Sequence, residues 1–520
     1  MQGFQLGERA ALAPELAPEV NTTAQSYQIQ DWQKGYRSLP QEYDYWIDEI
    51  EGQIPPDLTG TLFRNGPGLL DIAGQHVHHP FDGDGMISKI TFTAGRAHFQ
   101  NRYVRTQAYL EEQQAQRVLY RGVFGTQKPG GWLANAFDLR LKNIANTHII
   151  HWGEKLLALW EAAEPHRLDP TTLETIGIDY LEGVLQPGQA FAAHPRIDPA
   201  SQLDQGEPCL VNFSVKPGLS TTITLYEFAA SGKLLRQHAH AIPGFAFIHD
   251  FAITPHYCIF FQAPIAFNPL PYLLGFKGAG QCLQAKLNQP TQAIIIPRNG
   301  TDPVQIIPVE AGFVFHHANA FEQEGNLVVD SICYASLPAI EPDEDFRQVR
   351  FEKLDPGQLW RFRFDLAAQT VASQLLEARC CEFPVIHPDR VGQNYRYVYL
   401  GAAHDPIGNA PLQGVIKIDL ETGERQLWSA APRGFAGEPI FVPRTHLEPV
   451  SGAESEPEDA GWILLLTFNA ELERSELVIL DAQNLQQPIA KLRLKHHIPY
   501  GLHGSFVNRC FLKPGDERAA

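Results

Sequence analysis

Short hydrophobic runs dominate the chain, and their composition predicts β-strands. Runs such as TLFRNG at 61–66, TTITLYEF at 221–228, YRYVYL at 395–400 and WILLLTF at 462–468 are rich in β-branched and aromatic residues and end near turn residues. Helical periodicity is scarce, and the best candidate for a helix lies around residues 105–120. The pattern therefore predicts an all-β fold.

A repeated unit of nearly constant length underlies these strands. A strand ends near an acidic residue, a short turn follows and a second strand returns, at Asp169, Glu227, Asp365, Asp419 and Asp481. Three of the four intervals between these positions are similar in length, and the longer one, from Glu227 to Asp365, has room for two units and an insertion. Because a four-stranded propeller blade needs roughly 40 to 50 residues, the repeat predicts a seven-bladed β-propeller with long loops. An array of β-sandwiches would show similar strands, and the repeat alone leaves that alternative open.

Three segments lack the hydrophobic pattern of the folded domain. We expect residues 1–27 to form a loose leader and residues 513–520 to form a polar tail. Residues 448–461 read EPVSGAESEPEDAG, an acidic run between two strand-like runs, which predicts a flexible and exposed hairpin loop. We therefore expect a single domain over residues 28–512.

Composition narrows the class of protein. The formal net charge of −18 over 520 residues argues against electrostatic binding to nucleic acid. The seven cysteines are an odd number without CxxC spacing, which argues against a disulfide scaffold and favours a reducing, cytoplasmic setting. The segment 1–25 contains no continuous apolar core, so we expect no signal peptide.

Four histidines in apolar, turn-bounded surroundings recur at the blade spacing. They are His194, His249, His316 and His503. The first two intervals between them are each close to one repeat unit, and the interval from His316 to His503 is close to three. Residues at equivalent positions of successive blades point toward the axis of a propeller, so these four imidazoles would converge on one point. Clusters of imidazoles from distant parts of a chain suit zinc, iron, copper or nickel.

Three glutamates accompany these histidines, and two of them fit the same spacing. Glu382 follows His316 by about one repeat unit, and Glu438 follows Glu382 by about one more. Glu161 precedes His194 by a shorter interval. A metal-bound histidine normally donates its second N–H to a carboxylate, so these glutamates are candidates to orient the imidazoles. Buried Glu–His or Glu–Arg pairs that hold blades together would give the same spacing, and spacing alone does not separate the two interpretations.

Nine motifs resemble those of the carotenoid cleavage oxygenase family, and they follow that family's order from about residue 28 to 510. The motifs are FRNGPG at 63–68, HPFDGDGM at 79–86, NIANT at 143–147, AHPRIDP at 193–199, HDFAIT at 249–254, FHHANAFE at 315–322, EFP at 382–384, GEPIFVPR at 437–444 and PYGLHGSF at 499–506. Each motif is short, but nine in register are specific. Within the family, the resemblance is to members that cleave apocarotenoids.

The resemblance implies a seven-bladed propeller with a small helical and loop-built cap over an axial iron(II) ion. By resemblance, the iron ligands are His194, His249, His316 and His503, and His317 is excluded. The residues that complete the catalytic site by resemblance are Thr147, near the open coordination site, and the carboxylates Glu161, Glu382 and Glu438.

Iron with open coordination positions implies chemistry with dioxygen, whereas a four-histidine zinc site would be saturated. The chain has no motif typical of flavin, nicotinamide or haem binding, so the electrons would come from the substrate. The implied reaction is the cleavage by O2 of one conjugated C=C bond of an apocarotenoid, giving retinal-type aldehydes. A rigid polyene needs an apolar tunnel. The resemblance implies five tunnel-wall residues: Phe81, Trp160, Phe247, Phe315 and Tyr334.

A polyene substrate resides in membranes, and one segment has the composition of a membrane-contacting surface. Residues 253–276 contain no Asp, Glu, Lys or Arg, and Pro264, Pro269 and Pro271 are expected to exclude any helix and hence a transmembrane span. We therefore predict that residues 264–276 form an apolar loop at the tunnel mouth and that this loop makes peripheral contact with a bilayer.

Three alternatives stay open at this stage. A member of the same family could cleave stilbene-like phenolics, or it could carry out isomerohydrolase chemistry on retinyl esters. A propeller that binds carotenoid or lipid without turnover belongs to a different class of protein. A binding protein should tolerate the loss of His194 or Glu382, whereas an oxygenase should lose its activity.

Overall fold

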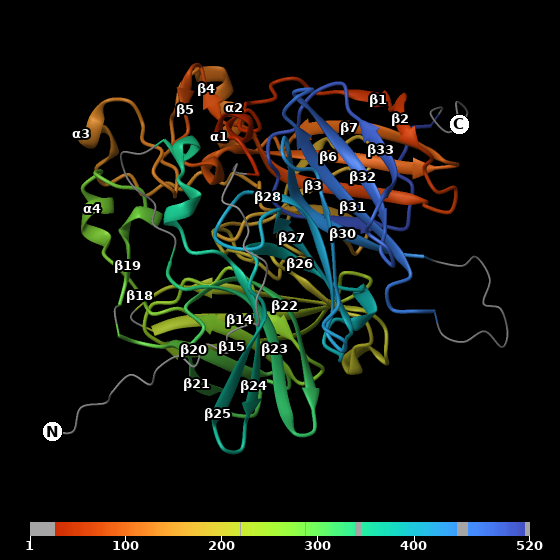
Figure 1. Cartoon of the computed structure of the whole chain (residues 1–520). Helices are drawn as coiled ribbons and strands as arrows, with labels where there is room; N and C mark the ends of the chain where they lie inside the picture. The colour runs from red at the N-terminus through yellow and green to blue at the C-terminus, as the bar shows by residue number, and fades with distance from the viewer. Residues whose placement is uncertain (1–25, 219, 287, 338–344, 445–455, 515–520) are drawn as a thin grey trace.

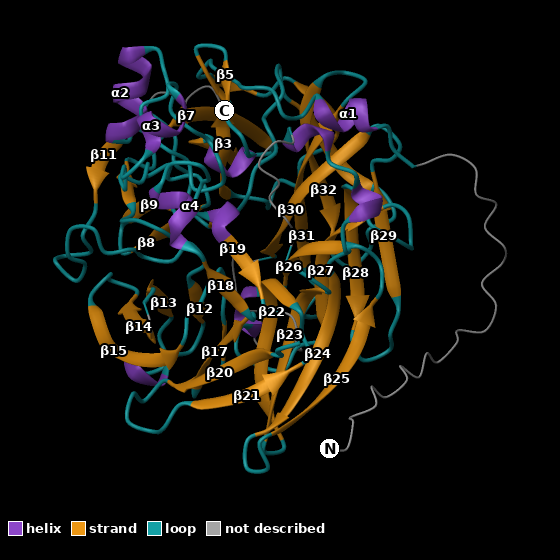
Figure 2. Cartoon of the chain, turned by 90° about the vertical axis from the view of Figure 1, so that its left-hand side faces the viewer, coloured by secondary structure: helices purple, strands orange, loops and turns teal. Residues whose placement is uncertain are grey.

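Seven β-sheets radiate from a common axis in the computed structural model, which describes residues 26–218, 220–286, 288–337, 345–444 and 456–514 (Figure 1). The four α-helices of the described residues gather in the upper half of the molecule in two perpendicular views (Figure 2). The predicted seven-bladed β-propeller is confirmed.

Each blade is an antiparallel sheet whose strands follow one another from the axis to the rim, apart from the strands that close the ring. The first four blades are β34 (Gly504–Val507), β3 (Gly60–Leu69), β6 (Asp84–Thr93), β7 (Arg96–Tyr103) and β1 (Asp44–Trp46); β8 (His148–Trp152), β9 (Lys155–Leu159), β10 (His166–Leu168) and β11 (Thr175–Ile178); β12 (Arg196–Asp198), β13 (Cys209–Lys216), β14 (Ser220–Ala229) and β15 (Leu234–Pro243); and β16 (Ala252–Ile253), β17 (Tyr257–Gln262), β20 (Thr291–Pro297) and β21 (Gln305–Val309). The other three blades are β22 (Phe313–Gln323), β23 (Asn326–Tyr334), β24 (Gln358–Asp365) and β25 (Thr370–Glu377); β26 (Cys381–Val385), β27 (Tyr397–Ala403), β28 (Leu412–Asp419) and β29 (Arg425–Ser429); and β30 (Gly434–Pro443), β31 (Gly461–Asn469), β32 (Arg474–Asp481), β33 (Pro488–Arg493) and β2 (Glu49–Gly52).

Strands from both ends of the chain close the ring. β2 pairs with β33 at the rim of the last blade, and β34 pairs with β3 at the inner edge of the first. The register places Glu49 opposite Arg493, and these two side chains also form an ion pair. Closure therefore joins residues from opposite ends of the sequence, and it leaves neither the first nor the last blade without a neighbour.

The hydrophobic core is divided among the seven interfaces between neighbouring blades. In β17, Cys258 and Phe260 pack toward the preceding blade, whereas Ile259 and Phe261 pack toward the following one. Both faces of a sheet are therefore buried, which explains why many strands appear in the sequence as continuous apolar runs rather than as alternating ones.

The repeated acidic turns mark the hairpin between the third and fourth strands of a blade. At four of them an aspartate accepts a hydrogen bond from the backbone N–H two residues later: Asp169, Asp365, Asp419 and Asp481. Glu227 is at the equivalent hairpin but lies within β14, where it pairs with Arg298 of the next blade. The longer interval from Glu227 to Asp365 holds two blade steps, and its insertion is the segment 263–290.

A cap of short helices and loops covers one end of the propeller (Figure 2). Its elements are α1 (Ile29–Gln33), α2 (Gln107–Ala115), α3 (Gly131–Asn135), α4 (Pro269–Leu273) and the two-stranded ribbons β4 (Asp71–Ile72) with β5 (Gln75–His76) and β18 (Ile265–Phe267) with β19 (Leu283–Ala285). α2 confirms the helix that was predicted around residues 105–120.

The prediction that the prolines of residues 264–276 would exclude any helix is wrong. α4 begins at Pro269, and Pro271 lies within its first turn, where the missing N–H has no partner to lose. Asn268 caps this helix by accepting a hydrogen bond from the backbone N–H of Leu270. α4 is a single short turn, and no helix of the described residues is long and apolar enough to cross a membrane.

The predicted leader, acidic loop and tail fall largely outside the described residues. Within the predicted leader, Tyr27 is buried among the rings of the α1 region, and the Ser26 hydroxyl donates a hydrogen bond to Asp405. The strands that flank the predicted acidic loop, β30 and β31, pair antiparallel.

Candidate metal centre

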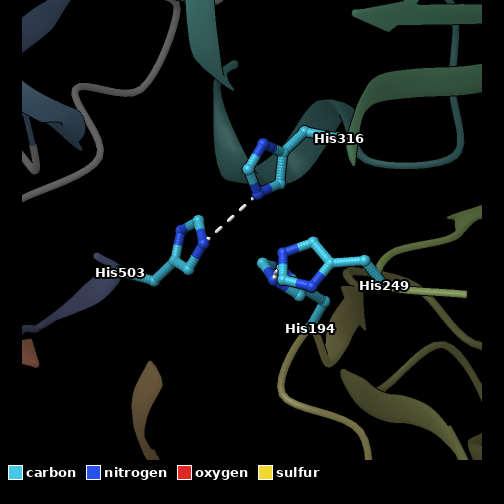
Figure 3. Close-up of side chains that lie close together, drawn as sticks. All are labelled: His194, His249, His316 and His503. Carbon is cyan, nitrogen blue, oxygen red and sulfur yellow. Dashed lines mark hydrogen bonds between the residues drawn. The ribbon is translucent and has the colours of Figure 1, made fainter. Parts of the chain in front are cut away.

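Four imidazoles converge on the axis of the propeller (Figure 3). The potential ligand atoms of His194, His249, His316 and His503 all lie within 4.8 Å of one another. The Nε2 atoms of His194 and His249 are 2.9 Å apart, and those of His316 and His503 are 3.2 Å apart. The structure thus brings together all four histidines that the sequence analysis selected.

Each histidine comes from the inner edge of a different blade. His194, His249 and His503 lie just before the innermost strands β12, β16 and β34, whereas His316 lies inside β22. The pairing of β22 with β23 shifts register between Val314 and His317, which is a β-bulge at the histidine. Such a bulge redirects a side chain that a regular strand would hold in alternation, and here it lets His316 face the axis.

Three of the four imidazoles are paired with a carboxylate through Nδ1. The distances from Nδ1 to oxygen are 3.0 Å for His249 and Glu161, 2.5 Å for His316 and Glu382, and 2.8 Å for His503 and Glu438. A carboxylate only accepts hydrogen bonds, so each Nδ1 carries the proton and each Nε2 keeps its lone pair. His194 has no carboxylate partner within the described part of the chain.

A further partner orients each of these carboxylates. Thr147 Oγ1 lies 3.2 Å from Glu161, the Tyr334 hydroxyl donates to Glu382 over 3.0 Å, and Arg64 forms an ion pair with Glu438. Glu382 and Glu438 also lie in strands whose pairing shifts register next to them, in β26 and β30. Bulges thus occur at the axial side chains of three successive inner strands.

Burial and mutual proximity keep two of the imidazoles neutral. The pKa values of His194 and His503 are held well below the usual histidine value, because burial and the neighbouring histidines disfavour a positive charge. Burial also lowers the pKa of His316, but the carboxylates of Glu382, Asp250 and Glu438 together outweigh it, and the net pKa is raised. The Nδ1–oxygen distance of the pair His316–Glu382 is the shortest of the three.

The donor set fits a divalent transition metal. Imidazole nitrogens of four histidines lie close around one point, and in three of them Nδ1 is bonded to a carboxylate, which leaves Nε2 to face the centre. Imidazole ligands suit zinc, copper, iron and nickel, and the carboxylates are occupied with Nδ1 rather than with the centre. The axial cluster is consistent with a four-histidine metal site.

A cavity of about 870 Å³ extends from the histidines into the cap. The five predicted wall residues all line it: Phe81, Trp160, Phe247, Phe315 and Tyr334. Thr147, Glu161 and Glu382 also border the cavity, whereas Glu438 lies behind His503. Tyr334 has a second contact that the sequence did not indicate, the hydrogen bond to Glu382.

Sequence analysis missed several residues that line the cavity. Phe383 lies beside the rings of His316 and His503, with centroids 5.6 and 5.4 Å away, and its φ of +53° is in the left-handed region. The EFP motif indicates Glu382, and its neighbour Phe383 was an equally available candidate. Phe124, Phe346 and His79 belong to cap loops, where no periodicity identifies an inward-facing side chain.

A family model, curated relatives and a solved structure each match most of the chain. Residues 36–508 match the model of the family RPE65, described as retinal pigment epithelial membrane protein. The apocarotenoid-15,15′-oxygenase of Synechocystis sp. is 60% identical over 492 residues, which cover 94% of this chain and 99% of that protein. Resveratrol cleavage oxygenase 1 of Aspergillus fumigatus is 29% identical over 483 residues, which cover 88% and 92% of the two chains. A crystal structure of cobalt-substituted Synechocystis ACO is 59% identical, with a TM-score of 0.90, covering 93% of this chain and 100% of that one.

Proposed function

Because the chain belongs to the RPE65 and carotenoid oxygenase family, as its motifs indicated, we propose that it is an iron(II)-dependent oxygenase that cleaves one conjugated C=C bond of an apocarotenoid. The observation that carries the proposal is the convergence of four imidazoles beside a cavity walled by aromatic rings. The 60% identity to an apocarotenoid-15,15′-oxygenase supports this substrate class over the stilbenoids of a 29% identical relative.

Iron(II) held by His194, His249, His316 and His503 would supply open coordination positions where dioxygen reacts with an electron-rich double bond. The bond R–CH=CH–R′ and one O2 give two aldehydes, RCHO and R′CHO, so no external reductant is needed. Each of the three carboxylates accepts a hydrogen bond from the Nδ1–H of its histidine and so holds that ring in place. The Nε2 lone pairs of these three rings are thereby kept directed at one point.

The walls of the cavity would align the polyene and exclude water. Trp160 is buried. The rings of Phe247 and Phe315 both pack against that of Phe313. Flat aromatic faces suit a rigid conjugated chain, because stacking contacts require no flexible adjustment. Thr147 lies between Asn146 and Glu161, 3.2 Å from each through its hydroxyl, and this contact fixes it at the cavity wall near His249. We assign it the role of limiting access to the open coordination side.

Peripheral contact with a membrane from the cytoplasm is part of the same proposal, and an exposed apolar patch supports it. The patch combines α4 with α3 and the loop after α3, which lie side by side because the Phe137 N–H donates to the Leu273 carbonyl over 2.8 Å (Figure 1). The exposed fractions of its large side chains are 49% for Trp132, 72% for Leu133, 74% for Phe137, 59% for Leu270 and 56% for Phe276. Three of these five side chains thus lie outside the predicted segment 264–276.

Liposome co-sedimentation tests the membrane contact. Changing Phe137, Leu270 and Phe276 together to Ser should release most of the protein from the liposomes, since each buried apolar side chain contributes about 1.5 to 3 kcal/mol. The control is Ile407→Ser, because Ile407 is 84% exposed but lies in a loop of the sixth blade. Undiminished binding of the triple variant would rule out this patch as the contact.

Turnover by the iron-loaded protein tests the reaction. We would load the purified chain with iron(II), add a C30 apocarotenal in mild detergent with O2, and identify the products by chromatography. Two aldehydes that require both iron and O2 are expected, and their lengths locate the cleaved bond. The zinc-loaded protein is the matched control. An intact polyene despite bound iron would overturn the proposal, and resveratrol cleavage or binding without turnover would then take its place.

A further inference from the structure

The cavity contains one enclosed hydrogen-bond donor that the chemistry above does not use. Apart from the axial histidines, the enclosed polar side chains that line it have partners within the protein: His78, Asn146, Thr147, Glu161, Gln281, Tyr334 and Glu382. The cations Lys277, Arg350 and Lys353 also line the cavity, but Arg350 and Lys353 are exposed and Lys277 is half-exposed. His79 also lines the cavity, but it belongs neither to these partnered side chains nor to these cations.

The backbone determines which nitrogen of His79 carries the proton. His79 caps a short 3-10 helix, Pro80–Asp82, and its Nδ1 accepts a hydrogen bond from the backbone N–H of Phe81 over 3.2 Å. A neutral imidazole with an accepting Nδ1 must carry its proton on Nε2. The ring therefore presents an N–H donor on the side away from its own backbone.

The surroundings of His79 are apolar. Its ring centroid lies 4.6 Å from that of Phe81, 5.4 Å from that of Phe124 and 6.4 Å from that of Phe346. Burial lowers the pKa of His79 to about 3, so the ring is neutral at physiological pH. Among the described residues, no acceptor lies within hydrogen-bond distance of its Nε2. Because the half-buried ring lines the cavity, a ligand oxygen can supply the acceptor that the described residues do not.

We propose that His79 Nε2–H donates a hydrogen bond to the terminal oxygen of the polyene, either an aldehyde carbonyl or a hydroxyl. This inference rests on the proposed function and deepens it by assigning the end group that is recognised. The contact joins the cap to the metal centre, since the Asn146 amide donates to the Phe81 carbonyl and Thr147 follows Asn146. His79 is thus a specificity-determining residue that sets how far an oxygenated polyene enters. A hydrocarbon end offers no acceptor and gains nothing at this position.

Two conservative variants separate the two nitrogens of the ring. In His79→Asn, the shorter amide oxygen can still accept from the N–H two residues later, but the distal donor is lost. In His79→Gln, the amide nitrogen reaches the place of Nε2 and restores a donor, while the cap is lost. The control is His78→Asn, because His78 also lines the cavity but its Nε2 lies 3.2 Å from the Gln281 amide.

Binding is measured by absorption with the iron-loaded protein under anaerobic conditions, where no turnover occurs. The probes are an apocarotenal and a hydrocarbon polyene of equal conjugated length. We expect His79→Asn to bind the apocarotenal about tenfold more weakly and the hydrocarbon within about twofold of the wild type, the size of one lost hydrogen bond. His79→Gln should retain most of the preference for the apocarotenal.

Two results would overturn the inference: equal weakening for both probes in His79→Asn, or loss of the preference in His79→Gln with its retention in His79→Asn. Either result would assign His79 to the structure of the cap rather than to the ligand. The test is independent of turnover, so a protein that binds with this preference but does not cleave would refute the proposed function and leave the inference intact.

Discussion

The axial site and the cap enclose one cavity, but they are held by different kinds of structure. The axial histidines, Glu382 and Glu438 lie in or next to the innermost strands of their blades, Glu161 follows β9, and each Nδ1–carboxylate pair joins two different blades. The cap consists of loops and short helices that rest on a few buried polar contacts, such as Lys142 with Asp84 and Glu112. The metal site is therefore held in place by contacts between blades. The shape of the cavity depends instead on cap loops, which can change without displacing the axial histidines.

The largest effect is expected from removal of a ligand. His316→Ala should abolish metal binding and turnover while the propeller stays folded, a loss well beyond the roughly 10- to 100-fold typical of residues that only support a ligand. Metal content per chain and product formation are the measurements. His317→Ala is the control, because His317 bonds to Ser331 and packs on Phe261 instead of facing the axis. It should lower the thermal stability and retain the metal.

The cap should be sensitive to loss of its buried cation. In Lys142→Met, Asp84 and Glu112 would be left buried without their cation, a change that typically costs about 3 to 5 kcal/mol. We expect faster hydrogen exchange and proteolysis in α2, with the metal content unchanged. Loss of metal together with cap opening would show that the two regions are not independent, and the comparison above would fail.

A smaller effect is expected when a carboxylate loses its charge. Glu382→Gln should weaken metal affinity by about 10- to 100-fold, because Gln can still accept from His316 Nδ1 but no longer polarises the ring. Competition with a chelator measures this affinity. Tyr334→Phe is the graded comparison, since it removes only the hydrogen bond to Glu382 and should cost less. Equal losses of metal affinity in both variants would contradict the expectation that the Glu382–His316 contact matters more than the Tyr334–Glu382 contact.

The smallest effect concerns pH and is confined to the cap. The Arg140 side chain, together with Lys128, holds the pKa of Asp138 below its ordinary value of 3.8. A carboxyl whose pKa is lower in the folded state stabilises the fold above about pH 4, and this contribution is lost as the pH falls. Hydrogen-exchange protection around α3, corrected for the intrinsic pH dependence of exchange, should therefore fall as the pH drops below about 4. Asp138→Asn should flatten that dependence, with a difference below about 1 kcal/mol because the pair is near the surface.

Much of the fold and the metal centre could be predicted from the sequence, because a propeller repeats its geometry once per blade. Asp365, Asp419 and Asp481 mark equivalent hairpins, so their spacing is the blade spacing. His316 and Glu382 lie on successive inner strands, so the same spacing connects them. The cap has no such repeat, and Phe124, Phe346 and His79 meet only through the folding of separate loops.

By itself the sequence determined the all-β architecture, the number of blades and which histidines and glutamates are equivalent, since hydrophobic runs and spacing are local, repeated properties. Only the tertiary structure decided which glutamate serves which histidine, because each pair joins two different blades, and the blades of His503 and Glu438 become neighbours only when the ring closes. It also decided where bulges interrupt the strand alternation to turn His316, Glu382 and Glu438 toward the axis. These outcomes depend on long-range packing, which no local pattern of residues specifies.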